Sequence, residues 1–328
     1  MTQKEKSRSE TKVAVLIGSG GGELEISYLS GDNVFKTLGK MGYTVEKLMF
    51  NPSTFAEDIM AINPTIVFNA MHGGFGEDGY VPAVLNKLHV PYTHSGYSAS
   101  RIGLDKIETL RLLDKYDIPV AKHIVVKYID LASGRYIDAI NDAVKLGLIS
   151  GSKFVIKPID YGSSVNVVCV DIEKDEQTKL QNICEQLDSG IDNYMVEEFC
   201  AGREFNVVVI DGFKTTLVEA MFEGDIYGYY DKFFNGWHDH DMADIEDEFK
   251  SHLIQMGNKV HDIIGCKDVS RSEFRVTFED GKPVKTIALE TNTHPGMTEA
   301  SFVTDVLNRS GDFENYLDRM VEKASYEV

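Results

Sequence analysis

Short apolar runs alternate with helical patterns through the first 95 residues of the chain. Lys12 to Gly18 is a largely apolar run, and Val45 to Phe50 and Thr65 to Phe68 repeat it. Between the first two runs, apolar residues recur at helical spacing up to Gly42, namely Ile26, Leu29, Val34, Phe35, Leu38 and Met41. Continuous apolar runs are typical of strands buried on both faces, and their alternation with helices predicts a parallel α/β layer.

The rest of the chain predicts further sheets with helices around them. Strands are predicted at residues 123–126, 153–157, 165–170, 193–199, 205–210, 215–219, 269–276 and 284–290, and helices at 79–88, 98–115, 136–146, 246–264, 300–310 and 313–325. We therefore predict a multi-domain α/β (α+β) protein. Its parts are a disordered tail at 1–11, an N-terminal α/β domain at 12–95, a central subdomain at 96–196 and a C-terminal subdomain at 197–328 with a lid loop at 222–244.

A strand end followed by a turn carries the first candidate chemistry. Glu290 and Asn292 lie two residues apart on a predicted strand and therefore share a face. Oxygen ligands of this kind suit Mg²⁺, which completes its coordination with substrate phosphates. Pro295-Gly296 then predicts a turn, and Thr298 with Glu299 predicts a helix start whose N–H groups could receive an anion. The alternative is a strand end with solvated polar residues followed by a capped helix.

A third oxygen ligand is predicted from the neighbouring strand. Arg271 and Glu273 share a face of the strand at 269–276. A hairpin after this strand brings it beside residues 284–290, so Glu273 is expected to approach Glu290. Three such ligands around a cleft predict a site for two Mg²⁺ ions.

Glycine-rich loops follow the first and third predicted strands. Gly18-x-Gly20 resembles the start of a dinucleotide-binding fingerprint, but Glu23 replaces its last glycine and no ribose-binding acid follows the second strand. The chain also contains no G-x-x-x-x-G-K-[ST] motif, which argues against a P-loop. Loops at the carboxyl ends of parallel strands commonly bind ligands, so Glu23 and His72 are expected to face one crevice. For Glu23 the alternative is a tight turn with a solvated acid.

Candidate ligands for a nucleotide begin with Lys157. This lysine ends an apolar strand. We give equal weight to a ligand-binding role and to an ordinary solvated lysine at this position. The next loop contains Gly162, Ser163 and Ser164, which could wrap a triphosphate or could simply favour a hairpin turn. Three acids near later strand ends could accept hydrogen bonds from adenine or ribose, although solvated acids would look the same; these are Glu197, Glu198 and Glu204.

The segment at 222–244 is long and rich in aromatic residues. Loops of this length inside compact domains are usually lids or disordered, and the aromatic content favours a lid. His238-Asp239-His240-Asp241 within it resembles a metal tract, but a hydrated loop is the preferred interpretation without further ligands.

Composition restricts the class of function. The chain has 328 residues, a formal net charge of -19, 43% hydrophobic and 26% charged residues. Such a charge argues against binding to nucleic acid, and it makes each lysine in a cleft informative about anionic substrates. The four cysteines form no C-x-x-C pair, and the sequence shows no signal-peptide pattern or apolar run of membrane length. We therefore expect a cytoplasmic protein with reduced thiols and no membrane partner.

In their order along the chain, these features resemble the D-alanine:D-alanine ligase family of the ATP-grasp fold. The resemblance extends from about Lys12 to Lys323. Its most diagnostic motifs are His72-Gly73-Gly74-x-Gly76-Glu77-Asp78-Gly79, Lys157-Pro158-x-x-x-Gly162-Ser163-Ser164, Arg271-Ser272-Glu273-Phe274 and Glu290-x-Asn292-Thr293-x-Pro295-Gly296-Met297-Thr298. The resemblance implies a parallel α/β domain followed by two α+β domains that enclose ATP. It also implies ATP-dependent synthesis of D-alanyl-D-alanine through a D-alanyl phosphate, for peptidoglycan precursors.

The resemblance also implies roles for individual residues. The phosphates would lie against Lys106, Lys157, Gly162, Ser164 and Lys232. The adenine would lie beside Glu197, Glu198 and Phe199, the ribose beside Glu204, and two Mg²⁺ or Mn²⁺ ions on Glu273, Glu290 and Asn292. The amino-acid substrates would be surrounded by Glu23, His72, Ser163, Arg271, Gly296, Ser301 and Phe302, with Phe233 at a lid position.

Three departures from the family pattern bear on activity. Glu273 stands where the family usually has Asp, Glu198 where many members have Lys, and Phe233 where a lid tyrosine is common. The missing tyrosine hydroxyl motivates a D-alanine:D-lactate depsipeptide ligase as an alternative. The other two departures motivate a non-catalytic ATP-binding regulator. We also expect a homodimer.

Overall fold

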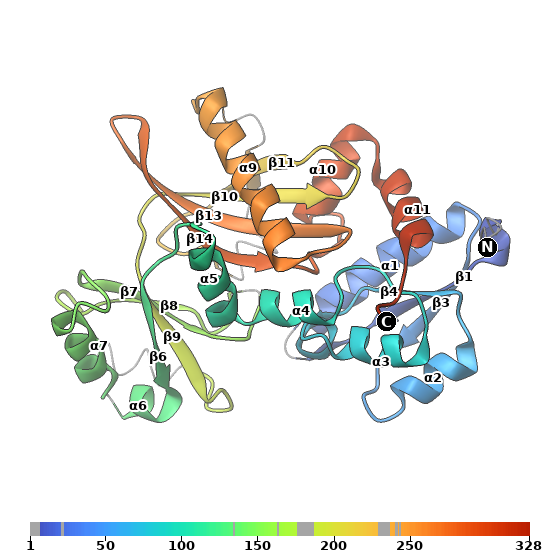
Figure 1. Ribbon diagram of the computed structural model, residues 1–328, viewed down its shortest axis with the longest axis horizontal. Helices are drawn as coiled ribbons and strands as arrows, with labels where there is room; N and C mark the ends of the chain where they lie inside the picture. Colours follow the sequence, from blue (N-terminus) through green and yellow to red (C-terminus); the bar gives the residue numbers. More distant parts are fainter. Residues whose placement is uncertain are drawn as a thin grey trace.

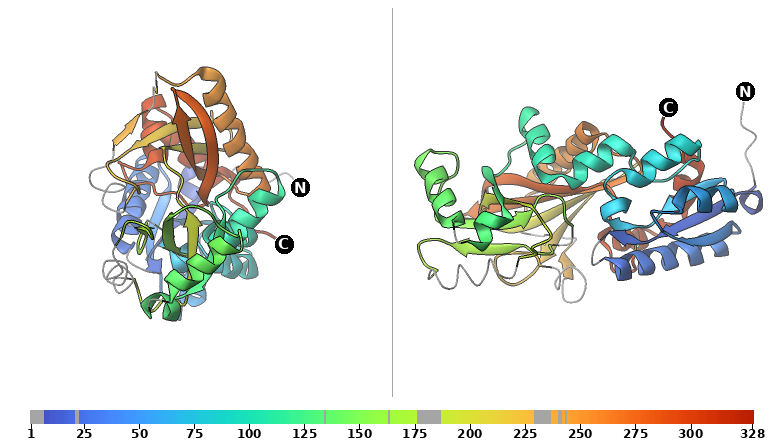
Figure 2. Two further views of the ribbon diagram at one scale, coloured as in Figure 1. Left: turned by 90° about the vertical axis from the view of Figure 1, so that its left-hand side faces the viewer. Right: turned by 90° about the horizontal axis from the view of Figure 1, so that it is seen from below.

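A computed structural model describes residues 7–20, 23–133, 135–162, 164–175, 187–228, 237–239, 242 and 244–328. In these residues the strands form a three-stranded, a four-stranded and a five-stranded sheet, and one pair of two-residue strands. Figures 1 and 2 show the three-stranded and four-stranded sheets at opposite ends of an elongated molecule, with the five-stranded sheet between them. None of the helices in these ranges combines the length and the apolar character that crossing a bilayer requires.

The three-stranded sheet is parallel, as its continuous apolar strands predict. β1 (Lys12–Ile17) lies between β3 (Thr44–Met49) and β4 (Ile66–Asn69). Helices cover both faces, namely α1 (Leu24–Lys40) on one and α2 (Phe55–Ile62) with α3 (Tyr80–Leu88) on the other. Residues 13–17 of β1 are consequently all buried.

Two short strands continue this sheet beyond its carboxyl edge. β2 (Ser19–Gly20) pairs in parallel with β5 (His72–Gly73), and the 3-10 turn η2 (Gly74–Gly76) follows. The loops after β1 and β4 therefore run side by side and lead toward Glu23 and His72.

A break at Asp105 divides the single helix that the sequence predicts at 98–115. The structure has α4 (Tyr97–Leu104) and α5 (Lys106–Lys115) instead. The Asp105 carboxylate accepts hydrogen bonds from the backbone N–H groups two and three residues later, both at 3.0 Å, and so caps the second helix. The prediction of one helix was wrong because an internal aspartate serves as an N-cap. Lys106 thereby becomes the first residue of α5.

The C-terminal tail holds the start of α4. The Glu327 carboxylate accepts a hydrogen bond from the backbone N–H of Tyr97 at 3.3 Å, and the Tyr92 N–H donates to the Ser325 carbonyl at 3.2 Å. A Cβ added to Gly96 would lie 1.9 Å from Glu327 Oε1. A side chain at position 96 would therefore displace this carboxylate, which lies at the end of a flexible side chain.

The four-stranded sheet is antiparallel and has one apolar and one polar face. Its strands lie in the order β6 (His123–Lys127), β9 (Asn193–Glu198), β7 (Lys153–Pro158) and β8 (Val168–Asp171). α6 (Tyr128–Ala132) and α7 (Tyr136–Lys145) cover the apolar face over Phe154, Ile156, Tyr194 and Val196. Lys157 and Glu197 alternate with these residues and therefore occupy the opposite face.

The five-stranded sheet is antiparallel and is backed by one long helix. Its order is β12 (Trp237–Asp239), β11 (Thr216–Met221), β10 (Arg203–Ile210), β13 (Val269–Glu279) and β14 (Lys282–Asn292). α9 (Asp247–Ile264) packs on the outer face, and α4 and α5 contact β14. β12 belongs to the segment predicted as a lid, and it carries two residues of the His238–Asp241 tract; the other two lie outside the described residues.

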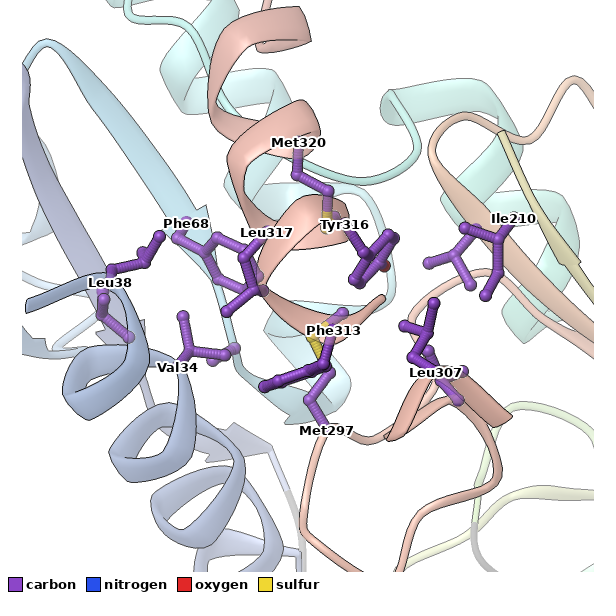
Figure 3. Close-up of a cluster of buried hydrophobic side chains, with 14 of the residues drawn as sticks. Val34, Leu38, Phe68, Ile210, Met297, Leu307, Phe313, Tyr316, Leu317 and Met320 are labelled. Atoms are coloured by element: carbon purple, nitrogen blue, oxygen red, sulfur yellow. The ribbon is translucent and has the colours of Figure 1, made fainter. Parts of the chain in front are cut away.

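The last two helices join the five-stranded sheet to the N-terminal sheet. α10 (Phe302–Ser310) and α11 (Phe313–Lys323) share one buried cluster with α1, β1, β4 and β10. Figure 3 shows Leu317 beside Phe68 and Leu38, and Tyr316 facing Ile210. Apolar packing therefore fixes the inner face of the five-stranded sheet against the carboxyl edge of the parallel sheet.

Candidate functional site

Two adjoining cavities bring the predicted residues together. The first cavity has a volume of about 520 Å³ and is lined by Glu23, His72, Gly162, Arg271, Asn292, Gly296, Ser301 and Phe302. The second has about 70 Å³ and is lined by Lys157, Ser164, Glu197, Glu198, Phe199, Glu204 and Glu273. Lys106 and Glu290 line both cavities. Ser163, Lys232 and Phe233 lie outside the described residues.

The β13–β14 hairpin places the three predicted metal ligands. Glu273 pairs with Glu290 across the two strands, and Arg271 pairs with Asn292. A bulge follows, because Phe274 pairs with Ala288 and leaves Leu289 as the extra residue. The extra residue reverses the alternation of faces, so Ala288 is buried in the core while Glu290 faces the cavities.

Cations and carboxylates form close pairs where the cavities meet. Arg271 Nη2 lies 2.7 Å from Glu273 Oε1, and Lys106 Nζ lies 3.5 Å from Glu290 Oε2. Lys106 Nζ also donates a hydrogen bond to the Tyr161 carbonyl at 2.6 Å. Burial lowers the pKa of Arg271, but the neighbouring carboxylates outweigh this and leave its pKa above the ordinary value. Arg271 is therefore a permanent positive charge between the cavities.

Two further ion pairs line the second cavity. Lys157 Nζ lies 2.6 Å from Glu197 Oε1, and Arg275 Nη2 lies 3.1 Å from Glu204 Oε2. All four side chains are at least nine-tenths buried. Glu197 Oε2 has no hydrogen-bond partner in the described residues, so it can accept one from a ligand. Sequence reasoning missed Arg275, although the two-residue period that joins Arg271 and Glu273 continues to it.

The Glu198 side chain is turned toward a nearby loop. Its Oε1 accepts hydrogen bonds from the backbone N–H and the hydroxyl of Ser150, both at 2.7 Å. The N–H groups of Glu198 and Phe199 donate to the carbonyls of Lys122 and Lys153 at 3.0 Å each. These N–H groups are therefore used within the sheet. Cys200, which the sequence reading did not select, also lines this cavity directly after the Glu-Glu-Phe run.

The loop after β7 closes over the first cavity. A Cβ on Gly162 would lie 3.3 Å from Glu23 Oε1, so the loop backbone passes close to that carboxylate. The Ser164 hydroxyl donates a hydrogen bond to the Tyr227 carbonyl at 2.9 Å. Ser164 and Asn166 have left-handed φ angles of 55° and 58°, which a β-strand does not contain. The loop is therefore longer than predicted, and β8 starts at Val168 instead of residue 165.

His72 links three parts of the first cavity. Its Nε2 lies 3.1 Å from the Ser30 hydroxyl on α1, and its Nδ1 lies 3.4 Å from Glu77 Oε1. The Ser30 hydroxyl in turn accepts a hydrogen bond from the Met297 N–H at 3.1 Å. Ser30 and Glu77 therefore orient His72. Glu77 belongs to the same sequence motif as His72, whereas Ser30 has no local signal in the sequence.

The turn after β14 differs from the predicted helix start. α10 begins at Phe302 with Ser301 at its N-cap, whereas the sequence suggested a start at Thr298. The Thr298 N–H donates to the Ser301 hydroxyl at 3.0 Å, which holds this segment in a turn. A Cβ on Gly296 would lie 3.0 Å from the Ser301 hydroxyl. Glycine therefore lets the backbone approach Ser301 beside the first cavity.

The donor set at Glu273, Glu290 and Asn292 fits Mg²⁺. No group of three or more His, Cys, Asp and Glu side chains in the described ranges is arranged around a metal position. The hairpin instead offers two carboxylates and one amide oxygen, and Asn292 Oδ1 already accepts a hydrogen bond from the His294 N–H at 2.6 Å. Mg²⁺ commonly uses one or two carboxylates and fills its other positions with substrate phosphates and water.

A buried histidine pair lies beneath this turn. The rings of His94 and His294 stack with centroids 4.3 Å apart, and His294 Nε2 lies 2.9 Å from Asn69 Nδ2. Burial lowers the pKa of His294 to about 4, and burial also lowers the pKa of His94 well below its usual value. Both rings are therefore neutral in the folded protein near neutral pH.

Acid is expected to destabilise the fold through His294. Its pKa is about 4 in the folded protein and about 6.5 in the unfolded chain, so the stabilisation is complete above pH 6.5 and is lost as pH falls toward 4. The expected loss is roughly 3 kcal/mol from this residue. Urea unfolding of wild type and His294→Asn between pH 7.5 and 4 measures it. A parallel pH dependence for both proteins would contradict the assignment, and His89→Asn at an exposed position is the control.

A family comparison matches most of the chain. The model described as D-ala D-ala ligase C-terminus matches residues 112–322. The D-alanine–D-alanine ligase of Rhizobium meliloti (strain 1021) is 34% identical over 322 residues, which cover 97% of this chain and 99% of the relative.

Solved structures share the fold. The crystal structure of the D-alanine–D-alanine ligase from Bacillus anthracis superposes with a TM-score of 0.76 at 24% identity, covering 95% of this chain and 96% of that one. A crystal structure of that ligase complexed with ATP gives a TM-score of 0.74 at 22% identity over the same shares of the two chains.

Proposed function

Because this chain belongs to the D-alanine–D-alanine ligase family, we propose that it joins two D-alanine molecules into D-alanyl-D-alanine at the expense of ATP. The family and the ATP-grasp fold predicted from the sequence are confirmed. The proposal is carried by one observation, the junction of the two cavities at Lys106 and Glu290. At this junction the terminal phosphate of a nucleotide in one cavity can meet a carboxylate in the other.

The second cavity is the proposed site for ATP. Lys106 and Lys157 are assigned to the phosphates, Glu204 to the ribose, and Glu197 with Phe199 to the adenine. Its volume of about 70 Å³ is below the range of about 300–1,000 Å³ that is typical of ligand pockets. We therefore infer that the four-stranded and five-stranded sheets move apart to admit the nucleotide.

Glu273, Glu290 and Asn292 would hold Mg²⁺, or Mn²⁺ in its place. When bound, the ions offset negative charge on the phosphates and on the attacking carboxylate. A carboxylate ~4 Å from one phosphate charge meets about 4 kcal/mol of repulsion at an effective dielectric of ~20, and ATP presents several such charges. In a chain of net charge -19, local cations are needed to make this approach possible.

The reaction is proposed to proceed in two substitutions. The carboxylate oxygen of the first D-alanine attacks the γ-phosphorus, the bond to the ADP oxygen breaks, and D-alanyl phosphate forms. The amine of the second D-alanine then attacks the acyl carbon, loses a proton, and displaces phosphate. Glu23 would bind the first ammonium group. The Arg271 guanidinium and the Gly296 N–H would stabilise the oxyanion of the tetrahedral intermediate.

We further propose that the protein is a cytoplasmic homodimer that supplies peptidoglycan precursors. α1 supports the dimer, because Leu24 and Tyr28, one turn apart on this helix, are each 50% exposed and line neither cavity. Large apolar side chains grouped on one helix are typical of an association surface. Light scattering coupled to gel filtration tests it, and a monomer at micromolar concentration would contradict it.

Phosphate release measured with ATP and Mg²⁺ tests the activity. We expect release that depends on D-alanine and forms D-alanyl-D-alanine, identified by mass spectrometry. Release only when D-lactate is also present would instead indicate the depsipeptide ligase. Nucleotide binding without phosphate release under any of these conditions would instead indicate a non-catalytic ATP-binding regulator.

Replacing Lys157 is expected to weaken ATP use. Lys157→Met should raise KM for ATP by about tenfold or more and lower kcat, because a charge-assisted phosphate contact is lost. The change also leaves Glu197 as a buried, unpaired carboxylate, which destabilises by about 3–5 kcal/mol.

The double variant Lys157→Met/Glu197→Gln separates binding from stability. It should recover thermal stability. Because Glu197 is itself assigned to the adenine, the reference for KM is Glu197→Gln alone, and KM for ATP of the double variant should be about tenfold higher than in that reference. Lys145→Met on the exposed face of α7 is the matched control. A KM for ATP equal to that of Glu197→Gln alone would contradict a role for Lys157 in ATP binding.

A further inference from the structure

Asn206 is a fully buried amide without hydrogen bonds. Its side chain is 0% exposed in the middle of β10, and neither Nδ2 nor Oδ1 has a hydrogen-bond partner in the described residues. The next three residues of the strand are valines. Buried polar atoms are nearly always paired, and an apolar side chain would satisfy this position better. The amide therefore calls for a functional explanation.

The register of the sheet places Asn206 beside the proposed metal ligands. It pairs directly with Glu273 on β13, and paired residues of neighbouring strands share a face. On its own strand it shares that face with Glu204, which lines the second cavity. Its partner on the other side is Val218, which has no polar side-chain atom. Asn206 thus lies where the polar half of this face meets the apolar half.

We infer that Asn206 is a positioning residue for the Glu273 carboxylate, acting when that carboxylate holds a divalent cation. The inference rests on the metal site proposed above. Carboxylates that bind metals are usually oriented by a hydrogen bond from a second group. Glu273 needs such a partner, since its side chain has three rotatable bonds. The amide Nδ2 directly across the ladder is a neutral donor that can fill this role.

Arg271 explains why a second donor is required. In the present structure Arg271 Nη2 donates to Glu273 Oε1 at 2.7 Å. A carboxylate that turns toward a cation loses this geometry, and the donor across the ladder replaces it. Arg271 Nε is also buried without a hydrogen-bond partner in the described residues, two pairs along the ladder from Asn206 and on the same face of the sheet. Asn206 Oδ1 can accept a hydrogen bond from Arg271 Nε while Asn206 Nδ2 donates to Glu273, so both polar atoms of the amide are used.

Binding of Mn²⁺ to the protein with a non-hydrolysable ATP analogue tests this inference. Electron paramagnetic resonance measures the concentration of free Mn²⁺ during the titration, and the measurement does not depend on catalytic turnover. We expect Asn206→Leu, which fills the volume without a donor, to weaken Mn²⁺ binding by about 10–100-fold. Asn206→Thr keeps a hydroxyl donor and should stay within about threefold of wild type. The melting temperature of Asn206→Leu should equal or exceed that of wild type.

The controls separate a local role from a general one. Tyr316→Phe removes a different buried polar group, a hydroxyl that has no partner in the described residues and lies outside both cavities, so Mn²⁺ affinity should not change. Wild-type affinity in Asn206→Leu, or equal weakening in Asn206→Thr, would overturn the role of Asn206 and leave the metal site standing. Absence of Mn²⁺ binding in the wild type would overturn both. Asn206→Ala provides the same comparison if the leucine variant does not fold.

Discussion

Replacing Glu290 by glutamine is expected to lower kcat/KM by about 10³-fold or more. Charge stabilisation by a bound metal ion is worth several kcal/mol, and each ~1.4 kcal/mol corresponds to a factor of ten. The amide keeps the shape of the side chain but not its charge. Lys106 retains its hydrogen bond to the Tyr161 carbonyl, so the fold should survive the change.

Steady-state phosphate release as a function of Mg²⁺ concentration measures this loss. Circular dichroism and the melting temperature show whether folding is intact. Glu279→Gln at the exposed end of β13 is a control on the same hairpin, and its kinetics should match wild type. Activity of Glu290→Gln within tenfold of wild type would discredit the metal assignment.

Arg271→Lys is expected to lower kcat by about 10²–10³-fold while KM for ATP changes little. Loss of one donor to an oxyanion has an effect of this size. Lysine keeps the positive charge beside Glu273 but lacks the planar fork of donors, so it cannot serve the carboxylate and the oxyanion together. A neutral replacement would be less informative, because it would leave a buried carboxylate unpaired.

Pre-steady-state measurements locate the affected step. Formation of D-alanyl phosphate from the first D-alanine should be affected less than its capture by the second amine. Arg309→Lys on the exposed side of α10 is the control. Turnover of Arg271→Lys within threefold of wild type would remove Arg271 from the reacting centre.

Local patterns in the sequence were sufficient to predict the parallel sheet and the β13–β14 hairpin. The strand at Val13 to Ile17 is a continuous apolar run because helices cover both of its faces. Glu273 could be expected near Glu290 because a hairpin places its two strands side by side, but their direct pairing depends on two register shifts that the sequence pattern does not show. Every predicted site residue within the described ranges lines one of the two cavities. Their individual roles remain predictions.

Features that depend on distant contacts could not be predicted in the same way. Asp105 could be either a residue within one long helix or the N-cap of a second helix, and the apolar pattern at 98–115 does not distinguish the two. The turn before Phe302 is held by the Ser301 hydroxyl and by Ser30 on α1, about 270 positions earlier in the chain. Arg275 could not be selected as a site residue from the sequence, because only its ion pair with Glu204 on another strand places it at the second cavity.

The hydrogen bond between the Glu327 carboxylate and the first residue of α4 has a practical consequence. α4 leads directly into α5, whose first residue is Lys106 at the junction of the two cavities. Ser325 and Glu327 therefore support the helix pair that carries the lysine proposed to bind the ATP phosphates, although they lie far from it in sequence. Changes that remove the Glu327 carboxylate are therefore expected to loosen the start of α4 and to displace Lys106, so preparations for kinetics should keep residues 325–327 intact.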